Sequence, residues 1–255
     1  MADAELLHTA VREAGLLARS LFQQKIKGWT KSDGSPVTEA DLAVDKMLKA
    51  RLNDERPDYG WLSEETPDTP ERLKRRQVWI VDPIDGTRAF AQGGDEWCIA
   101  VALLVDGRPH LAAIYRPMVE DFYAAEHGRG ARLNGKKLQV GTASDLAGAR
   151  VLGNASALKQ LQEKAPVEAV PSGNTPLAMR LARVAEGQLD AALSTMPKHD
   201  WDLAAVDLLV HEAGGAVTGL NGKVFTYNRA ETRQANYVAT SQTLHATILE
   251  QLAAS

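Results

Sequence analysis

Apolar positions near the start of the chain repeat with the period of a helix, so that they fall on one face. These positions are Leu7, Val11, Ala14, Leu17, Ala18 and Leu21. We expect an amphipathic helix whose apolar face packs on a sheet. Another helix is expected to begin near Ala40, and a third to run from Asp200 until Gly214-Gly215 ends it.

The middle of the first half has the pattern of strands. Residues 78–81 are all apolar and predict a buried strand, which we expect Pro83 to stop because proline has no N–H to donate. Residues 98–105 and 111–115 flank Asp106-Gly107, a typical hairpin turn, and residues 121–125 predict a further strand. These segments predict an antiparallel sheet.

After about residue 143 strands and helices alternate. We expect strands at 151–155 and near 167–170, a helix from Ser156, and another helix opened by residues 174–176. The alternation predicts a second layered unit and places the chain in the α/β (α+β layered) class. We therefore divide the 255 residues into an N-terminal unit, 1–142, and a C-terminal unit, 143–255, with no flexible linker between them.

Composition narrows the class of protein. A net charge of −4 and 44% apolar residues are ordinary for a soluble globular protein. The basic run 72–76 is short and is interpreted as a solvated connection, so we predict no nucleic-acid binding. The single cysteine, Cys98, excludes disulfides within the chain, indicates a reducing cytoplasm and is expected in the core. The acidic start and the absence of a long apolar run predict neither a signal peptide nor a membrane span.

Two carboxylates, Asp82 and Asp85, follow the apolar strand 78–81. Clustered carboxylates repel each other, and a divalent cation removes that repulsion. Ligands that offer only oxygen suit Mg²⁺, Mn²⁺ or Ca²⁺. The alternative is that both acids merely cap and turn the chain.

Two further acidic pairs have the same ambiguity. Glu64 and Glu65 stand where a short apolar segment gives way to a loop, and they could belong to a solvated acidic loop. Asp200 and Asp202 open the third helix, where acids are favoured as cap and first-turn residues. The combination of three pairs favours a metal centre.

Four segments, taken in their order along the chain, resemble the inositol monophosphatase family of metal-dependent phosphate monoesterases. Residues 79–90 read WIVDPIDGTRAF, residues 201–215 read WDLAAVDLLVHEAGG, residues 63–65 read SEE, and residues 31–41 read KSDGSPVTEAD. The likeness covers nearly the whole chain. It implies a stacked α-β-α-β-α sandwich and a homodimer that acts on a small phosphorylated metabolite.

The resemblance also implies a set of metal ligands. Asp82 would bridge two Mg²⁺ ions, with Glu64 on one ion, and Asp85 and Asp202 on the other. The backbone carbonyl of Ile84 would be a further ligand, and a weaker third cation would lie near Glu64. Mn²⁺ would substitute for Mg²⁺, and Li⁺ would inhibit at the weaker site.

Catalytic roles follow from the same resemblance. The Thr87 hydroxyl, paired with Asp41, would orient or deprotonate the attacking water, and Glu64 completes the catalytic set. The N–H groups of Gly86 and Thr87 would hold the phosphate. Alternatively, Thr87 and Asp41 are helix caps. The roles of Lys31, Glu65 and His199 stay open at this point.

The leaving group is the least determined feature. Inositol-specific members carry a glutamate where this chain has Thr195, which disfavours inositol phosphate. Segment 31–41 and the residues LSEE at 62–65 resemble the branch of the family that acts on adenosine 3′,5′-bisphosphate. We expect Thr195, Lys198, Asp202 and the loop 172–175 to contact the substrate. The alternatives are an inositol-1-monophosphatase, a histidinol-phosphate or fructose-bisphosphate phosphatase, and a non-catalytic protein that only holds metal.

Overall fold

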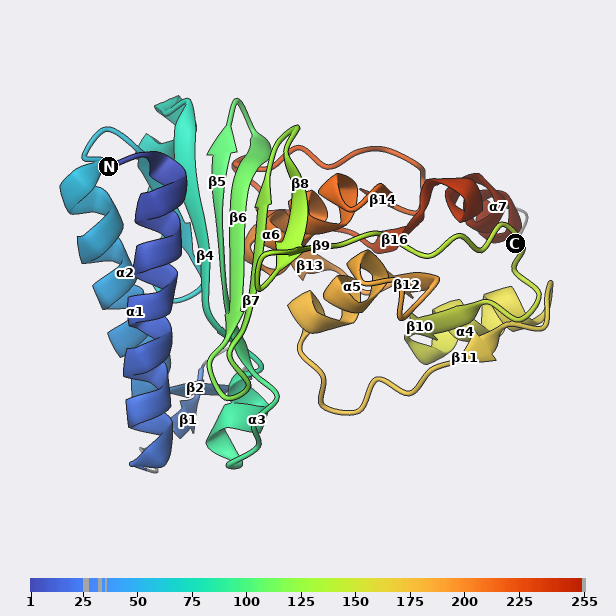
Figure 1. Cartoon of the computed structure of the whole chain (residues 1–255), viewed down its shortest axis with the longest axis horizontal. Coiled ribbons are helices and arrows are strands. Elements are labelled where there is room, and N and C mark those ends of the chain that lie inside the picture. Colours follow the sequence, from blue (N-terminus) through green and yellow to red (C-terminus); the bar gives the residue numbers. More distant parts are fainter. Residues whose placement is uncertain (25–27, 32–33, 35, 254–255) are drawn as a thin grey trace.

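The computed structural model describes residues 1–24, 28–31, 34 and 36–253, so Ser32, Asp33 and Ser35 of the segment 31–41 lie outside the described residues. Alternating layers of helix and sheet build the molecule (Figure 1). Helices α1 and α2 cover one face of the larger sheet, α5 and α6 lie between the two sheets, and α4 and α7 cover the smaller one. The predicted stacked sandwich is confirmed.

The helices have these bounds: α1 Asp3–Gln23, α2 Glu39–Glu55, α3 Thr87–Ala91, α4 Ala155–Gln162, α5 Leu177–Ala185, α6 Asp200–Glu212 and α7 Gln242–Ala253, with the 3₁₀ helix η1 at Pro70–Lys74. The larger sheet has the order β3-β4-β5-β6-β7-β8-β9, and the smaller one β11-β10-β12-β16-β14. Two small ribbons, β1-β2 and β13-β15, lie outside them.

The strands of the larger sheet are β3 Gly60–Ser63, β4 Gln77–Asp85, β5 Cys98–Val105, β6 Arg108–Arg116, β7 Asp121–Glu126, β8 Gly130–Leu133 and β9 Lys136–Lys137. Those of the smaller sheet are β10 Arg150–Gly153, β11 Glu168–Ala169, β12 Ala191–Ser194, β14 Gly215–Thr218 and β16 Tyr237–Ser241. The ribbons consist of β1 Gly28–Thr30, β2 Pro36–Thr38, β13 Lys198–His199 and β15 Arg233–Gln234.

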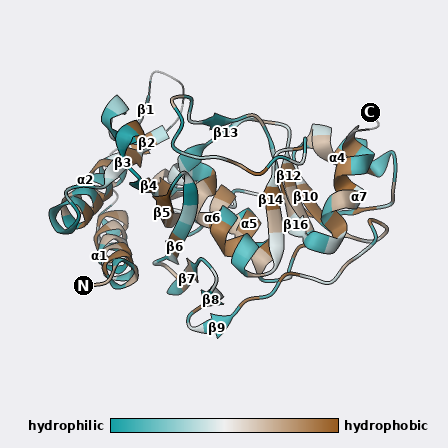
Figure 2. Ribbon diagram, turned by 90° about the horizontal axis from the view of Figure 1, so that it is seen from above, coloured by the Kyte–Doolittle hydropathy of each residue, from teal (hydrophilic) through white to brown (hydrophobic). Residues whose placement is uncertain are grey.

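The first helix packs as its pattern predicts. Leu7, Val11, Ala14 and Ala18 of α1 are completely buried in a cluster with residues of α2 and of the larger sheet. Apolar residues of α5 and α6 fill the space between the two sheets (Figure 2). This central cluster contains residues from both predicted units, and the boundary at residue 143 stays a prediction.

Strand β4 differs from its prediction in a way that matters for the site. It does not stop at Pro83 but continues to Asp85, with a shift of register against β5 between Asp82 and Asp85. Pro83 therefore marks an irregularity rather than the end of the strand, because the missing N–H interrupts the ladder only locally. The shift places Asp82 and Asp85 at the end of a strand that is buried for most of its length.

The interpretation of the basic run 72–76 as a solvated connection was wrong for Arg72. This side chain is 2% exposed, and it donates to both carboxylate oxygens of Asp68 at 2.6 Å and to the carbonyl of Arg229. Arg72 thus ties η1 to the segment that precedes β15. Cys98 is buried with a free thiol, as expected of a core residue. Among the described residues, no helix has the length and apolar character needed to cross a bilayer.

Candidate active site

The acidic residues predicted to bind metal line one pocket at the carboxyl ends of β3 and β4. Glu64, Asp82, Ile84, Asp85 and Asp202 all contribute to its wall, and its volume is about 340 Å³. Parallel pairing of β3 with β4 brings the first two together, since the Glu64 N–H donates to the carbonyl of Val81, one residue before Asp82. Ligand sites at the carboxyl ends of strands are the rule in layered α/β proteins.

Asp82 is buried, and one of its carboxylate oxygens has no hydrogen-bond partner. It is 2% exposed, and its Oδ1 atom is buried without a hydrogen-bond partner. Burial raises the pKa of Asp82 well above its ordinary value, and the charges of Glu64, Asp85 and Asp202 raise it further. A buried carboxylate oxygen without a partner is costly, so this position calls for a cation.

Asp85 is held by the start of helix α5. Its two oxygens accept the N–H groups of Ala178 at 2.7 Å and Leu177 at 3.3 Å, where the helix dipole favours negative charge. Burial nevertheless raises the pKa of Asp85 to about 6. Burial likewise raises the pKa of Asp202, although the charge of Lys198 opposes this, and one Asp202 oxygen accepts the His199 N–H at 2.7 Å.

Glu64 and Glu65 share a cation supplied by the chain itself. Lys31 Nζ lies 3.2 Å from Glu64 Oε1 and 2.5 Å from Glu65 Oε1. Burial raises the pKa of Glu64 to about 7 even so, with repulsion from Glu65 and Asp202 acting in the same direction. Lys31 is therefore a counter-charge in the site rather than a solvated side chain.

Hydrogen bonds to Asp45 of α2 hold the loop that carries Glu64 and Glu65. Its carboxylate accepts hydrogen bonds from Ser63 Oγ at 2.5 Å and from Thr66 Oγ1 at 2.6 Å. The two bonded residues flank Glu64 and Glu65 in the sequence. Asp45 therefore positions the acidic loop against the end of β4.

The acids line the pocket without converging on one point. No three Asp, Glu, His or Cys side chains in the described ranges form a ready-made metal cluster. Part of the reason is visible: Lys31 engages Glu64, while backbone N–H groups engage Asp85 and Asp202. The donor set of carboxylates and the Ile84 carbonyl still fits a hard divalent cation such as Mg²⁺. Among the described carboxylates of the pocket, Asp82 has the oxygen, Oδ1, that is buried without a hydrogen-bond partner.

Thr87 and Asp41 lie together, as the resemblance implied. Thr87 Oγ1 is 2.9 Å from Asp41 Oδ1 and 3.0 Å from the carbonyl of Ile84, and its single hydrogen can serve one acceptor at a time. The other Asp41 oxygen accepts the Thr38 N–H at 2.8 Å, as part of the capping box of α2, and also accepts the Thr38 hydroxyl at 2.6 Å. Asp41 thus caps a helix and also orients Thr87, which lines the pocket.

Gly86 joins two walls of the pocket and cannot be replaced without strain. Its φ of 101° is left-handed, and a Cβ there would lie 2.8 Å from the carbonyl oxygen of Glu96 and 3.0 Å from Pro176 Cγ. Gly86 precedes α3, and Pro176 precedes α5. The close approach brings the starts of both helices to the pocket.

The predicted substrate contacts separate into two groups. Lys198 lines the pocket, as do residues 173–175 of the predicted loop. Thr195 is not among the lining residues. Its hydroxyl accepts from Asn154 Nδ2 at 2.8 Å, and its N–H donates to Asn154 Oδ1 at 3.0 Å.

The residues at the start of α6 have structural partners. The His199 ring stacks on Trp201 with centroids 4.3 Å apart, and its Nδ1 pairs with Thr232. Asp200 is fully buried and accepts from Gln234 Nε2 and from the Asn228 N–H. Asp200 therefore anchors β15 and the segment before it, while the capping bond at the start of α6 is made by Asp202.

Sequence reasoning missed two cations of the pocket wall, Arg88 and Arg180. Arg180 lies on α5, and its Nε donates to the carbonyl of Thr175 at 2.7 Å. Because Arg180 follows Pro176 by four residues, both lie on the same face of this helix start. This spacing of four residues was the sequence signal that could have placed Arg180 beside the pocket.

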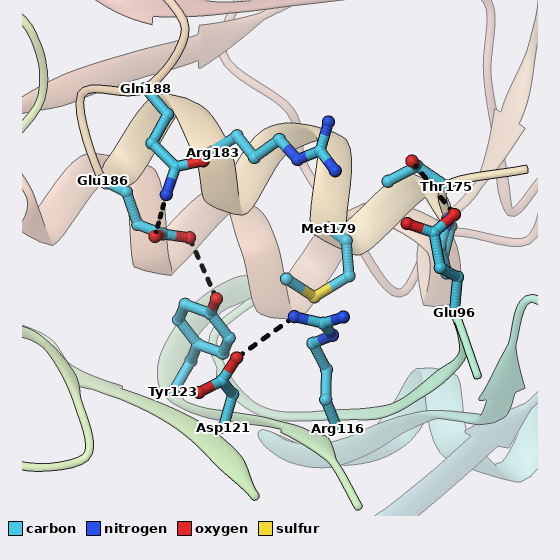
Figure 3. A pocket seen from close by; sticks show the side chains of 10 residues that line it. Glu96, Arg116, Asp121, Tyr123, Thr175, Met179, Arg183, Glu186 and Gln188 are labelled. Atoms are coloured by element: carbon cyan, nitrogen blue, oxygen red, sulfur yellow. Dashed lines mark hydrogen bonds and ion pairs between the residues drawn. The ribbon is translucent and has the colours of Figure 1, made fainter. Parts of the chain in front are cut away.

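A smaller pocket of about 170 Å³ lies behind the same loop and shares Thr175 and Pro176 with the first (Figure 3). Several of its polar groups satisfy each other. Arg116 pairs with Asp121 at 3.1 Å, and the two oxygens of Glu186 accept from the Tyr123 hydroxyl and from Gln188. Glu96, Asp121 and Glu186 are the carboxylates of this pocket, and the last two are engaged by neighbouring side chains, unlike the unpartnered Asp82 oxygen of the first pocket.

Comparison with known proteins places the chain in a family. The model of the inositol monophosphatase family matches residues 3–255. A Streptomyces griseus protein named glucose-1-phosphate thymidylyltransferase is 38% identical, with 86% of each chain covered. The 3′(2′),5′-bisphosphate nucleotidase CysQ of Aggregatibacter actinomycetemcomitans is 32% identical over 87% of this chain and 86% of its own. The names of these relatives differ, so they leave the substrate open.

Solved structures agree with the fold. A Staphylococcal inositol monophosphatase-1 soaked in lithium chloride superimposes with a TM-score of 0.86 at 24% identity, over 98% of this chain and 94% of its own. An IMPase/NADP phosphatase in complex with Mg²⁺ and phosphate gives 0.85 at 23% identity, over 98% and 95%. The match over the full chain, together with the pocket of carboxylates at the strand ends, shows that this protein belongs to the inositol monophosphatase family of phosphate monoester hydrolases.

Proposed function

We propose that the protein hydrolyses a phosphate monoester of a small metabolite with the help of Mg²⁺. The observation that supports this most is the buried, unpartnered Oδ1 of Asp82 in a pocket shared with Glu64, Asp85 and Asp202. Asp82 would be common to two ions. Glu64 would hold one of them, and Asp85, Asp202 and the Ile84 carbonyl the other, with a weaker third ion near Glu64. Bound ions would neutralise the phosphate oxygens and acidify water.

The residues around this centre have definite tasks in the proposal. Asp41 accepts the hydrogen of Thr87 Oγ1, which leaves the lone pairs of that oxygen free to accept a hydrogen bond from a water. The water is thereby oriented, and its proton has a neighbouring route toward the Asp41 carboxylate. Gly86 and Thr87, at the start of α3, would donate their N–H groups to the phosphate.

We further propose adenosine 3′,5′-bisphosphate as the substrate. Arg88, Arg180 and Lys198 line the same pocket as the acids. Once metal has neutralised the carboxylates, these three cations favour a leaving group that carries a negative charge of its own. Arg180 is held in place by its bond to the Thr175 carbonyl, so its remaining N–H groups are available for a second phosphate.

The test is phosphate release from a panel of monoesters at saturating Mg²⁺. The panel contains adenosine 3′,5′-bisphosphate, inositol 1-phosphate, histidinol phosphate and fructose 1,6-bisphosphate. Release from the nucleotide with the highest kcat/KM supports the proposal. A tenfold preference for inositol phosphate would refute the nucleotide assignment but not the phosphatase. No release from any ester by folded protein would favour a metal-holding binding protein instead.

Two broader features complete the proposal. We expect an enzyme of the cytoplasm, since its only cysteine is a buried free thiol. We also expect a homodimer, by resemblance to the family. Sedimentation at several protein concentrations tests the second point.

A further inference from the structure

A second groove, outside the catalytic pocket, lies in the segment 219–236 that connects β14 with β16. Its volume is about 420 Å³. Three cations line it, Lys223, Arg229 and Arg233, and no carboxylate among the described residues does. The groove therefore has an excess of positive charge, although the protein as a whole has a net charge of −4.

The cations of the groove are not neutralised by ion pairs. Within the described ranges, none of the three is paired with a carboxylate, and Arg229 makes only a long hydrogen bond of 3.4 Å to Gln234 Oε1. The charge of Arg229 does act at a distance on Asp200, whose pKa burial raises and Arg229 lowers. Lys223 and Arg233 remain available to a ligand.

The neutral side chains of the groove also favour an anion. The Oδ1 atom of Asn221 accepts the Lys223 N–H at 3.0 Å, and that of Asn236 accepts the Leu220 N–H at 2.7 Å. Their acceptor oxygens are therefore engaged by the backbone, while an amide side chain still has two N–H donors to offer. The groove combines positive charge with hydrogen-bond donors.

We propose that this groove binds a small polyanion, a molecule with two or more phosphate groups, at a site separate from the catalytic pocket. The cavity is large enough for a molecule rather than a single oxyanion. Its three cations match the charge of a ligand with more than one phosphate group.

The groove has a direct structural connection to the catalytic pocket. Arg233 of β15 lies opposite His199 of β13, and Gln234 lies opposite Lys198. The His199 N–H donates to Asp202, and Lys198 lines the catalytic pocket. A ligand that binds Arg233 and displaces β15 would thus also displace β13. Because β13 carries Lys198, this displacement would change the KM of the enzyme. Binding itself does not depend on the proposed function, whereas this effect on KM rests on it.

The test is a calorimetric titration with inorganic tripolyphosphate in EDTA, which keeps metal out of the catalytic pocket. The groove variant carries Lys223→Gln and Arg233→Gln. A surface control carries Lys136→Gln and Lys137→Gln, which remove the same charge from exposed positions of β9. A pocket control carries Lys198→Gln. Thermal unfolding confirms that each variant is folded.

The expected result is binding that weakens at least tenfold in the groove variant and less than twofold in both controls. Equal weakening in the surface control would reduce the effect to overall charge and overturn the proposal. Loss in the pocket control alone would move the site to the catalytic pocket, and absence of binding in the unmodified protein would also overturn it. A single-stranded RNA oligonucleotide that displaces tripolyphosphate at a lower concentration would replace the small-molecule assignment.

A kinetic assay tests whether a ligand in the groove affects the KM of the enzyme. The groove variant should keep its kcat, and its KM should no longer respond to tripolyphosphate at constant free Mg²⁺. If no substrate is turned over at all, the proposed function fails while the titration still decides the groove.

Discussion

Neutralising Glu64 should change how the stability of the metal-free protein depends on pH. Burial raises the pKa of Glu64 from 4.5 to about 7 in the folded state. A carboxyl whose pKa is raised on folding contributes stability that is complete below pH 4.5 and is lost as the pH rises through 7. Between pH 5 and pH 8 this loss amounts to about 2 to 3 kcal/mol, at about 1.4 kcal/mol for each unit of pKa.

The assay is urea unfolding in EDTA at pH 5, 6, 7 and 8 for the unmodified protein and for Glu64→Gln. Titrating groups that do not interact with Glu64, including the histidines, are common to both proteins and cancel in the difference. Asp82 does not cancel, because the charge of Glu64 raises its pKa in the unmodified protein. We expect the unmodified protein to lose about 2 to 3 kcal/mol relative to the variant over this range. The control is Glu71→Gln, which removes an exposed carboxylate from η1.

Saturating Mg²⁺ provides a second readout, because a cation that binds only the folded, ionised site stabilises the folded state by RT ln(1 + L/Kd), where L is the concentration of the free cation. It should flatten the pH dependence of the unmodified protein. A difference between the unmodified protein and Glu64→Gln that stays constant from pH 5 to pH 8, or that changes in the opposite direction, would show that Glu64 is not strained by burial. The electrostatic account of the site would then be wrong.

Four further predictions concern turnover, specificity and stability. Asp82→Asn should abolish hydrolysis while the fold is kept, and near-normal kcat at moderate Mg²⁺ would contradict its place at the centre of the site. Arg180→Gln should raise the KM for adenosine 3′,5′-bisphosphate about tenfold and leave that for inositol 1-phosphate within twofold; an equal rise for both esters would remove Arg180 from leaving-group recognition. Li⁺ should inhibit at the weaker cation position, which a titration of the initial rate tests, and full activity in excess Li⁺ would count against that position. Arg72→Ala should lower the free energy of unfolding by about 2 to 3 kcal/mol, because it removes buried hydrogen bonds to the segment before β15, and a loss below about 0.5 kcal/mol in urea unfolding would contradict that role.

The layers and most of the pocket could be predicted from local patterns. Helical periodicity placed α1, the alternation after residue 143 predicted strands β10 and β11 of the smaller sheet, and short motifs placed Asp82, Asp85 and Asp202 on one pocket. These features depend on residues that are neighbours in the sequence. The strand around Pro83 was misjudged because proline interrupts a ladder without having to end it.

Partners that are distant in the sequence could not be predicted in the same way. Lys31 meets Glu64 and Glu65 across more than thirty positions, and the burial of Arg72 depends on the segment before β15, over 150 positions away. Thr195 has the right place in the motif, yet Asn154 takes its hydrogen bonds. A side chain's partner is decided by tertiary packing, and no local pattern encodes it.

The bond between Asp85 and helix α5 has a consequence for how the enzyme is made. Asp85 and its backbone donors at Leu177 and Ala178 are 92 and 93 positions apart. During synthesis the chain therefore emerges with this carboxylate exposed to water and able to capture ions loosely, until α5 has been translated and docked. Only then does the aspartate become fixed at the helix start. A product truncated before α5 would lack both N–H donors and would leave this carboxylate of the pocket unfixed.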